Sequence, residues 1–251
     1  MSVKNIDITS DVQCPFCLIG VKQILNAVEK YKKDHPQSSE YQIRLLPYQL
    51  DPCLTEEPGN RVEYYYKKFG EVRAKQIMSS MGSRLESLGF KSDYGGTVAS
   101  THYCHRLQTY ALLNHPSKQL PLAMDIFEGF HGYKKNPCDK EWLASLAAKH
   151  GIFESESKAL EWLDGNECDA EVKQSYVIAK KLGVTGVPFF VFQGQYAASG
   201  AMGEDEFYKL LAEIDKRENT PKQDTPAILA EGEVCGREGG SCGNDMVAAS
   251  S

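Results

Sequence analysis

Residues 14–17 read Cys-Pro-Phe-Cys, and the segments on either side of this motif decide the fold. A short strand-like stretch precedes the motif and contains Val3, Ile6 and Ile8. The residues after it repeat an apolar side chain every three or four positions, which predicts a helix that is buried on one face. These apolar positions are Leu18, Val21, Leu25, Val28 and Tyr31. A Cys-x-x-Cys motif between a strand and a helix is typical of a redox-active dithiol.

The helix start gives the two cysteines different expected roles. Pro15 suits the first helical turn, where a missing backbone N–H costs nothing. Cys14 therefore lies where unpaired N–H groups and the helix dipole favour negative charge. We expect its thiol to have a pKa below the reference of about 8.5 and to attack a disulfide sulfur as a thiolate. Cys17, one turn further on, is the expected resolving thiol, and we expect Pro15 and Phe16 to contact the substrate.

Two other interpretations of the motif are weaker. A Cys-x-x-Cys pair can be half of a zinc site, but such a site needs a second pair of ligands. The other close pair, Cys235 and Cys242, has six intervening residues, so no metal site is expected. A purely structural disulfide is also disfavoured, because linking near neighbours constrains little chain entropy.

A second signal lies far downstream, in residues 183–192, which read Gly-Val-Thr-Gly-Val-Pro-Phe-Phe-Val-Phe. This is a turn, then a proline, then an apolar strand-like run. In thioredoxin folds a cis-proline loop faces the Cys-x-x-Cys motif, and cis peptide bonds are almost confined to X–Pro. We predict a cis bond before Pro188; a trans proline that opens a buried strand is the alternative. The backbone of Val187 would then pair with an extended peptide or with glutathione, as an added strand does.

Composition excludes several classes of function. The chain has 251 residues, is 41% hydrophobic and carries a net charge of −6, so no attraction to nucleic acid or anionic membranes is expected. No stretch approaches the roughly 20 apolar residues of a membrane span. The N-terminal residues have no hydrophobic signal core, so a cytoplasmic location is the expectation. In that reducing compartment the eight cysteines would be mostly thiols, and we expect Cys53, Cys104, Cys138 and Cys168 to be small buried side chains.

The order of the predicted elements indicates an α/β protein with a thioredoxin fold that is interrupted by an all-α helical insertion domain. Residues 1–60 read as strand, helix and strand, and residues 165–218 as helix, two strands and a last helix. Between them, residues 61–164 have helical periodicity and little strand character.

Residues 219–251 differ in composition from the rest of the chain. They hold two bases and five acids, a net charge of −3, with few large apolar residues. We expect a flexible acidic tail. It carries Cys235 and Cys242, and a dithiol on such a tail could exchange its disulfide with the main motif, as a redox relay. The alternative is two incidental thiols.

Four motifs together resemble the FrnE-type branch of the DsbA-like thioredoxin-fold family, over roughly residues 5–215. These are residues 10–20 (Ser-Asp-Val-Gln-Cys-Pro-Phe-Cys-Leu-Ile-Gly), 100–107 (Ser-Thr-His-Tyr-Cys-His-Arg-Leu), 183–190 and 199–202 (Ser-Gly-Ala-Met). The resemblance implies a protein disulfide oxidoreductase. The related 2-hydroxychromene-2-carboxylate isomerases and kappa-class glutathione transferases use glutathione and usually have a serine at the position of Cys14. This chain departs from the branch at Phe16, Ser100 and Met202, where tryptophan, asparagine and glutamine are usual.

The resemblance also implies further site residues. His105 and Arg106 would lie on an insertion helix that faces the active-site cleft, His105 stabilising a thiolate or moving a proton and Arg106 binding a substrate carboxylate. A helix cap or a surface ion pair is the alternative for both. Ser199 and Gly200 would belong to a substrate or glutathione pocket.

Three functions follow as hypotheses. The first is a thiol–disulfide oxidoreductase acting on protein or glutathione disulfides, with no tightly bound cofactor and glutathione as a co-substrate. The second is a glutathione-dependent transferase or isomerase of small aromatic substrates, and the third is a redox-regulated chaperone or binding module. The insertion could also supply the face of a homodimer.

Overall fold

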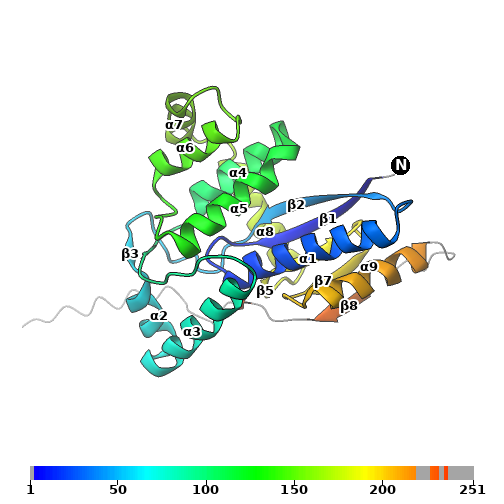
Figure 1. The fold of residues 1–251 in the computed structure, drawn as a ribbon. Coiled ribbons are helices and arrows are strands. Elements are labelled where there is room, and N and C mark those ends of the chain that lie inside the picture. The colour runs from blue at the N-terminus through cyan, green and yellow to red at the C-terminus, as the bar shows by residue number, and fades with distance from the viewer. Residues whose placement is uncertain (1–2, 219–226, 232–234, 237–251) are drawn as a thin grey trace, which may run out of the picture.

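The computed structural model describes residues 3–218, 227–231 and 235–236 of the chain. Its main sheet has five strands in the order β2-β1-β6-β7-β8 (Figure 1). The pairs β1–β2 and β7–β8 are parallel, and β1–β6 and β6–β7 are antiparallel. The strands are β1 (Val3–Ser10), β2 (Glu40–Pro47), β6 (Phe189–Phe192), β7 (Tyr196–Ser199) and β8 (Ala227–Glu231).

The alternation of apolar residues in β1 sets the register of the sheet's centre. Ile6 and Ile8 are fully buried and lie opposite Phe192 and Phe190 of β6. Period-two alternation puts both isoleucines on one face of the strand, so a shift by one residue would expose them. The pattern in the sequence therefore positions β1, and with it the motif that follows.

Helices α1 (Pro15–Asp34) and α9 (Glu204–Glu218) pack side by side on the sheet (Figure 1). Leu18, Val21 and Tyr31 of the predicted α1 stripe are buried. Leu25 and Val28 are only half-buried, because the buried face runs through Ile24 and Ala27 instead. Phe207 of α9 packs edge-on against Phe190, with ring centroids 4.8 Å apart. Helix α8 (Asp169–Lys181) contacts β2 and α4.

Six helices form the region between residues 61 and 164, together with the short antiparallel pair β3 (Gly59–Asn60) and β4 (Thr97–Val98). Much of it has an apolar core of its own, which includes Leu107, Leu122, Ile126 and Leu143. Phe127 of α5 and Leu85 of α3 instead join the core of the sheet domain, so the two parts share packing. The helices are α2 (Arg61–Phe69), α3 (Glu71–Ser87), α4 (His102–Asn114), α5 (Pro116–Gly132), α6 (Lys140–Lys149) and α7 (Glu156–Asp164).

This architecture confirms the predicted fold class, a thioredoxin fold with an inserted helical part. The domain boundaries themselves stay predictions. The described parts of the expected tail are strands: β8 extends the main sheet, and β9 (Cys235–Gly236) pairs antiparallel with β5 (Gly186–Val187). No helix within the described residues is both long and apolar enough to cross a membrane.

Candidate active site

The two cysteines of the motif lie at the start of α1, directly after β1. Cys14 is the N-cap residue with extended backbone angles, and Pro15 is the first helical residue. No side chain caps this end of α1, and the helix dipole favours a thiolate at Cys14. Cys17 follows one turn later, and its N–H donates to the Cys14 carbonyl at 3.0 Å. Both residues are thiols and are fully buried.

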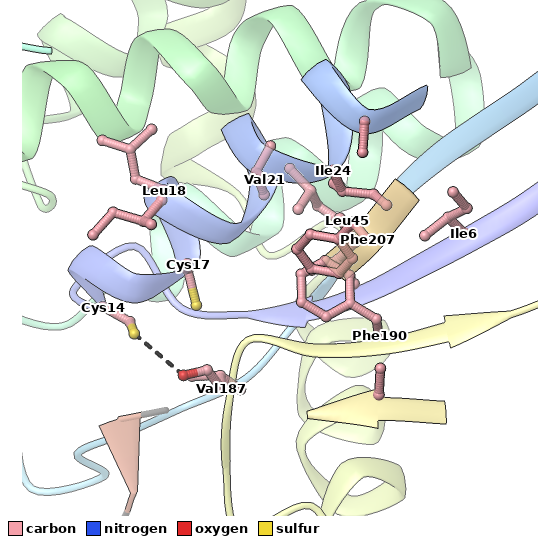
Figure 2. Close-up of a cluster of buried hydrophobic side chains, with 14 of the residues drawn as sticks. Ile6, Cys14, Cys17, Leu18, Val21, Ile24, Leu45, Val187, Phe190 and Phe207 are labelled. Carbon is pink, nitrogen blue, oxygen red and sulfur yellow. Dashed lines mark hydrogen bonds between the residues drawn. The ribbon is translucent and has the colours of Figure 1, made fainter. Parts of the chain in front are cut away.

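The proline loop lies directly across from Cys14. The Val187–Pro188 peptide bond is cis, which confirms that prediction. The Cys14 thiol donates to the Val187 carbonyl with Sγ and O 3.4 Å apart, as Figure 2 shows. The structure thus brings together Cys14, Cys17, Val187 and Pro188 from segments some 170 residues apart in the chain.

Close packing holds this loop against α1. A Cβ atom added at Gly20 would lie 3.0 Å from Pro188 Cγ and 3.2 Å from the Phe190 ring, closer than ordinary van der Waals contact, so the glycine lets the loop approach α1. The Gly200 N–H donates to the Pro188 carbonyl at 2.9 Å, and Ser199 pairs with Phe189 across β6 and β7. Ser199 and Gly200 therefore lie beside the cis-proline loop and support its backbone.

The edge strand at this loop is already paired. Val187 lies opposite Cys235, and Gly186 opposite Gly236, in the antiparallel pair of β5 and β9. An extended segment of the chain itself thus lies beside Cys14, at the edge where the sequence predicts an extended substrate. Cys242 and the side chain of Cys235 lie outside the described residues.

A buried carboxylate organises the loop before the motif. Asp11 is fully buried and accepts hydrogen bonds from the N–H groups of Gln13 and Leu50 and from the Thr101 hydroxyl. Burial raises its pKa to about 6, although the three hydrogen bonds oppose the shift. Asp11 therefore ties together the active-site turn, the segment after β2 and the start of α4. Sequence reasoning missed this role, because one acid between a strand and a helix carries no pattern of its own.

His105 lies behind this carboxylate. Its Nε2 is 3.7 Å from Asp11 Oδ1 and has no hydrogen-bond partner, and its Nδ1 is 2.7 Å from the Tyr176 hydroxyl. Burial lowers the pKa of His105 to about 3, so the ring is neutral. Tyr176 also contacts His102, which pairs with Asp169 at 2.8 Å. A row of polar groups thus runs from Asp11 through His105, Tyr176 and His102 to Asp169 at the start of α8.

Arg106 makes other contacts than those that the resemblance implies. Its side chain is buried, and its guanidinium donates to the carbonyls of Leu163 at the end of α7 and of Gly165 and Glu167 in the turn that follows. It also lies over the Trp162 ring at 5.1 Å. Three backbone carbonyls already accept hydrogen bonds from this guanidinium. The arrangement therefore favours a structural role for Arg106 over recognition of a substrate carboxylate.

The other cysteines also differ in part from expectation. Cys104 and Cys168 are buried and Cys138 is half-buried, broadly as predicted. Burial raises the pKa of all three thiols, to about 11 for Cys138 and Cys168. Cys53 was expected to be a buried thiol, but it is exposed and disulfide-bonded. Its loop follows β2 and has little apolar cover, which is why the expectation fails there.

A cavity adjoins the motif on the side of the helical insertion. Gln13, Pro15 and Phe16 line it from the active-site turn, and side chains of α2 and α3 complete it. Its volume is about 590 Å³. Phe16 is half-buried, with the Arg84 guanidinium 5.9 Å from its ring centroid. Sequence reasoning placed Pro15 and Phe16 at the site but did not find the aromatic wall supplied by α2.

Comparisons with known proteins agree with this geometry. The model of the DSBA-like thioredoxin domain family matches residues 5–213. The uncharacterized protein YwbO of Bacillus subtilis is 21% identical over 217 residues, which are 85% of this chain and 98% of that protein. The family model thus spans all of the chain but residues 1–4 and 214–251.

Solved structures show the same fold. A probable DsbA oxidoreductase of Streptomyces coelicolor is similar with a TM-score of 0.76 and 24% identity, over 88% of this chain and 93% of that one. The cytosolic disulfide reductase DsbM of Pseudomonas aeruginosa is similar with a TM-score of 0.53 and 15% identity, over 84% of this chain and 98% of that one. DsbM has also been solved with GSH. The family predicted from the motifs is confirmed.

Proposed function

The chain belongs to the DSBA-like thioredoxin domain family, and from this we propose that it is a thiol–disulfide oxidoreductase that uses Cys14 and Cys17 on protein or glutathione disulfides. One observation carries the proposal: the Cys14 thiol lies at the start of α1 and 3.4 Å from the carbonyl that precedes the cis proline. Helix-start thiols of Cys-x-x-Cys motifs have lowered pKa values and are good nucleophiles. The backbone at Val187 already pairs with the extended segment β9, and an extended substrate would take the same edge in its place.

The reaction consists of two thiol–disulfide exchanges. The Cys14 thiolate attacks one sulfur of the substrate disulfide, the substrate S–S bond breaks, and one substrate thiol leaves with a proton. The Cys17 thiolate then attacks the sulfur of Cys14, which releases the second substrate thiol and leaves a Cys14–Cys17 disulfide. The substrate has gained two electrons, and the protein has lost them. Two molecules of a small thiol such as glutathione restore the dithiol and form glutathione disulfide, so no bound cofactor is required.

Two tests address this proposal. We expect the protein to reduce insulin disulfides in the presence of a small thiol and Cys14→Ser to lose this activity. Cys17→Ser should accumulate a mixed disulfide with the substrate, because the second exchange cannot occur. If Cys17→Ser keeps the full activity of the unaltered protein, only Cys14 is needed, as in a glutathione-dependent transferase or isomerase. Equal insulin reduction by Cys14→Ser and by the unaltered protein would rule out Cys14 as the nucleophile.

We also propose that Cys235 and Cys242 form a redox relay with the motif. The pairing of β9 with β5 supports this, because it brings the backbone of Cys235 opposite Val187, whose carbonyl accepts the Cys14 thiol. In the relay the tail dithiol reduces the Cys14–Cys17 disulfide and becomes a disulfide itself. The double variant Cys235→Ser, Cys242→Ser should then slow turnover with glutathione as reductant. Unchanged turnover by this variant would exclude the relay.

The same proposal includes the location and the oligomeric state of the protein. A reducing, cytoplasmic location fits a reductase that uses glutathione, and a homodimer through the helical insertion is proposed alongside it. Fractionation of cells and light scattering of the purified chain would test these two points. A protein recovered outside the cytoplasm, or a monomer at all concentrations, would contradict them.

A further inference from the structure

Cys104 and Cys138 of the helical insertion are a second pair of neighbouring thiols. The Cys104 thiol, in the first turn of α4, donates to the carbonyl of Pro137 with Sγ and O 3.3 Å apart. Pro137 directly precedes Cys138 in the chain. In return, the Cys138 thiol donates at 3.0 Å to the carbonyl of Ser100, just before α4. Each thiol therefore contacts the backbone near the other cysteine, and both lie at one contact between the start of α4 and the segment before α6.

Solvent reaches the two thiols unequally. Cys104 is fully buried in the apolar core of the insertion, in the same cluster as Leu107 and Leu143. Cys138 is half-buried. A dissolved disulfide therefore meets Cys138 first, and Cys104 can react only with a sulfur that Cys138 already carries. An outer thiol that attacks and an inner thiol that resolves are the two parts that disulfide formation by exchange needs.

The same contact lies next to polar groups that organise the active-site turn. Thr101, the N-cap residue of α4, donates to the buried Asp11 carboxylate at 2.8 Å. Thr101 is also the neighbour of Ser100, whose carbonyl accepts the Cys138 thiol. A covalent bond between Cys104 and Cys138 would therefore fix the end of α4 that holds Asp11.

We propose that Cys104 and Cys138 are a second redox site, which glutathione disulfide oxidises to a cross-link between the start of α4 and the segment before α6. This site is separate from the exchange proposed for Cys14 and Cys17, and its test does not depend on that activity. Glutathione disulfide is also the product that the proposed cycle forms, so both sites exchange with the same glutathione pool.

The oxidation consists of two exchanges. Cys138 loses its proton to solvent, and its thiolate attacks one sulfur of glutathione disulfide, whose S–S bond breaks. One glutathione leaves and takes up a proton, and Cys138 keeps the other as a mixed disulfide. Cys104 then loses its proton, attacks the sulfur of Cys138 and releases the second glutathione. The protein loses two electrons, and glutathione disulfide gains them.

The surroundings of the pair make the cross-link slow to form and slow to open. Burial raises the pKa of both thiols, to about 11 for Cys138, so little thiolate is present to start the oxidation. Thiols with a raised pKa are also poor leaving groups when glutathione attacks their disulfide. The cross-link therefore responds to a lasting excess of glutathione disulfide and does not follow single turnovers at Cys14.

Peptide mapping tests the inference directly. The reduced, unaltered protein is incubated with glutathione disulfide at mildly alkaline pH, where more Cys138 is ionised. The remaining thiols are blocked with iodoacetamide, and the protein is digested without reductant. We expect one product that joins the peptides of Cys104 and Cys138, and dithiothreitol should remove it. The same product should form in the double variant Cys14→Ser, Cys17→Ser, because neither thiol of the motif takes part.

Single substitutions separate the two exchanges. Cys104→Ser should stop at the mixed disulfide of Cys138 with glutathione, and Cys138→Ser should leave Cys104 a thiol. Cys168→Ser is the matched control, because burial also raises the pKa of Cys168 to about 11 but this residue lies at the start of α8. It should keep the cross-link. Loss of the cross-link in Cys168→Ser as well would overturn the direct pairing of Cys104 with Cys138.

The melting temperature tests whether the cross-link holds the insertion together. A disulfide that closes residues 104–138 into a loop restricts the unfolded chain. The rise in Tm from the reduced to the oxidised form should therefore be larger in the unaltered protein than in Cys104→Ser, by on the order of 5 °C. An equal rise in both proteins would overturn the role of the cross-link in fixing α4.

The remaining outcomes are also decisive. A mixed disulfide at Cys138 without any cross-link in the unaltered protein would overturn the inference, because it would show that the two sulfur atoms do not meet. Absence of any reaction at Cys138 would overturn it as well. Both results leave the proposed function standing, since insulin reduction through Cys14 is measured separately. They come from the unaltered protein, so they decide even if a variant does not fold.

Discussion

Cys14 of the sheet domain and Cys104 of the helical insertion lie in similar local settings. Both are fully buried near the start of a helix, and both donate a thiol hydrogen bond to a backbone carbonyl, at 3.4 Å to Val187 and 3.3 Å to Pro137. Each also has a second cysteine nearby, Cys17 and Cys138 respectively.

The surroundings of the two thiols differ. Burial raises the pKa of Cys104 well above the ordinary value, and the charges of Cys138 and Asp11 add to this. Cys14 instead begins its helix as the N-cap, beside an edge strand that accepts an extended segment. A place near a helix start is therefore not sufficient for reactivity. Cys14 is an N-cap residue beside an edge strand that pairs with an extended segment, whereas Cys104 lies inside the first turn of α4 beside Cys138 and Asp11.

Replacing each thiol in turn should give the largest difference. Cys14→Ser should lower kcat/KM for a disulfide substrate by at least about a thousandfold, because a hydroxyl is a poor nucleophile at neutral pH. Cys104→Ser should keep kcat/KM within about threefold, since it only exchanges a buried thiol for a hydroxyl. Reduction of glutathione disulfide measures both. A comparable loss in the two variants would show that the insertion's thiol takes part in catalysis.

Alkylation kinetics should separate the thiols next. With a pKa of about 11, Cys138 is about one part in ten thousand thiolate at pH 7, so its rate with iodoacetamide should be over a hundredfold below that of an ordinary thiol. The rate should rise about tenfold for each pH unit up to pH 10. Cys14 should react faster and level off at lower pH. Mass spectrometry of peptides from the reduced protein after timed alkylation gives each rate. A flat pH profile at Cys138 would contradict the raised pKa.

The carboxylate that lies between the two thiol regions should affect stability in a pH-dependent way. Asp11 has a folded pKa of about 6 against 3.8 unfolded, so the folded protein binds the extra proton between those values and its stability rises as pH falls through 6. Asp11→Asn removes this term, about 3 kcal/mol when complete. The deficit of the variant in unfolding free energy should therefore be larger at pH 4 than at pH 7. Urea unfolding at several pH values measures it.

Thr101→Val is the control for that experiment. It removes the hydroxyl that donates to Asp11 at 2.8 Å but leaves the carboxylate in place. It should lower stability by about 1–3 kcal/mol through an unmade buried hydrogen bond, and some pH dependence should remain. A pH-independent deficit in Asp11→Asn would mean that the Asp11 pKa is close to its unfolded value.

The smallest effect is expected at Cys138. Its thiol donates to the Ser100 carbonyl at 3.0 Å, and a serine hydroxyl can make the same bond. Cys138→Ser should change the free energy of unfolding by less than about 1 kcal/mol. It should not change the rate of disulfide reduction, and the alkylated peptide that contains Cys138 should disappear from the mass spectrum. A large loss of turnover would indicate a second working dithiol with Cys104.

Much of the site could be predicted because its signals are local. Cys14 and Cys17 were found from a motif between a strand and a helix, and Val187–Pro188 from a turn before an apolar strand. The cis bond is confirmed, and Gly20 has a close contact with Pro188 that explains its place three residues after Cys17.

The missed features depend on contacts between distant segments. Asp11 and Thr101 are 90 residues apart and meet only in the fold. The resemblance implied that Arg106 binds a carboxylate, but its guanidinium donates to three carbonyls at the end of α7 and in the turn after it. The strands β8 and β9 were missed because their segments are short and lie among glycines and acids, where no periodicity develops.

The sequence by itself determined the fold class, the place of the Cys-x-x-Cys motif at a helix start and the loop that faces it. Each of these follows from the spacing of a few residues along one helix, strand or turn, and such spacing is fixed by backbone geometry. Only the tertiary structure decided which polar groups lie around those thiols, that α2 supplies an aromatic wall and that β9 occupies the edge at Val187. These depend on which distant segments pack together, and burial then sets the charge and the partners of every group between them.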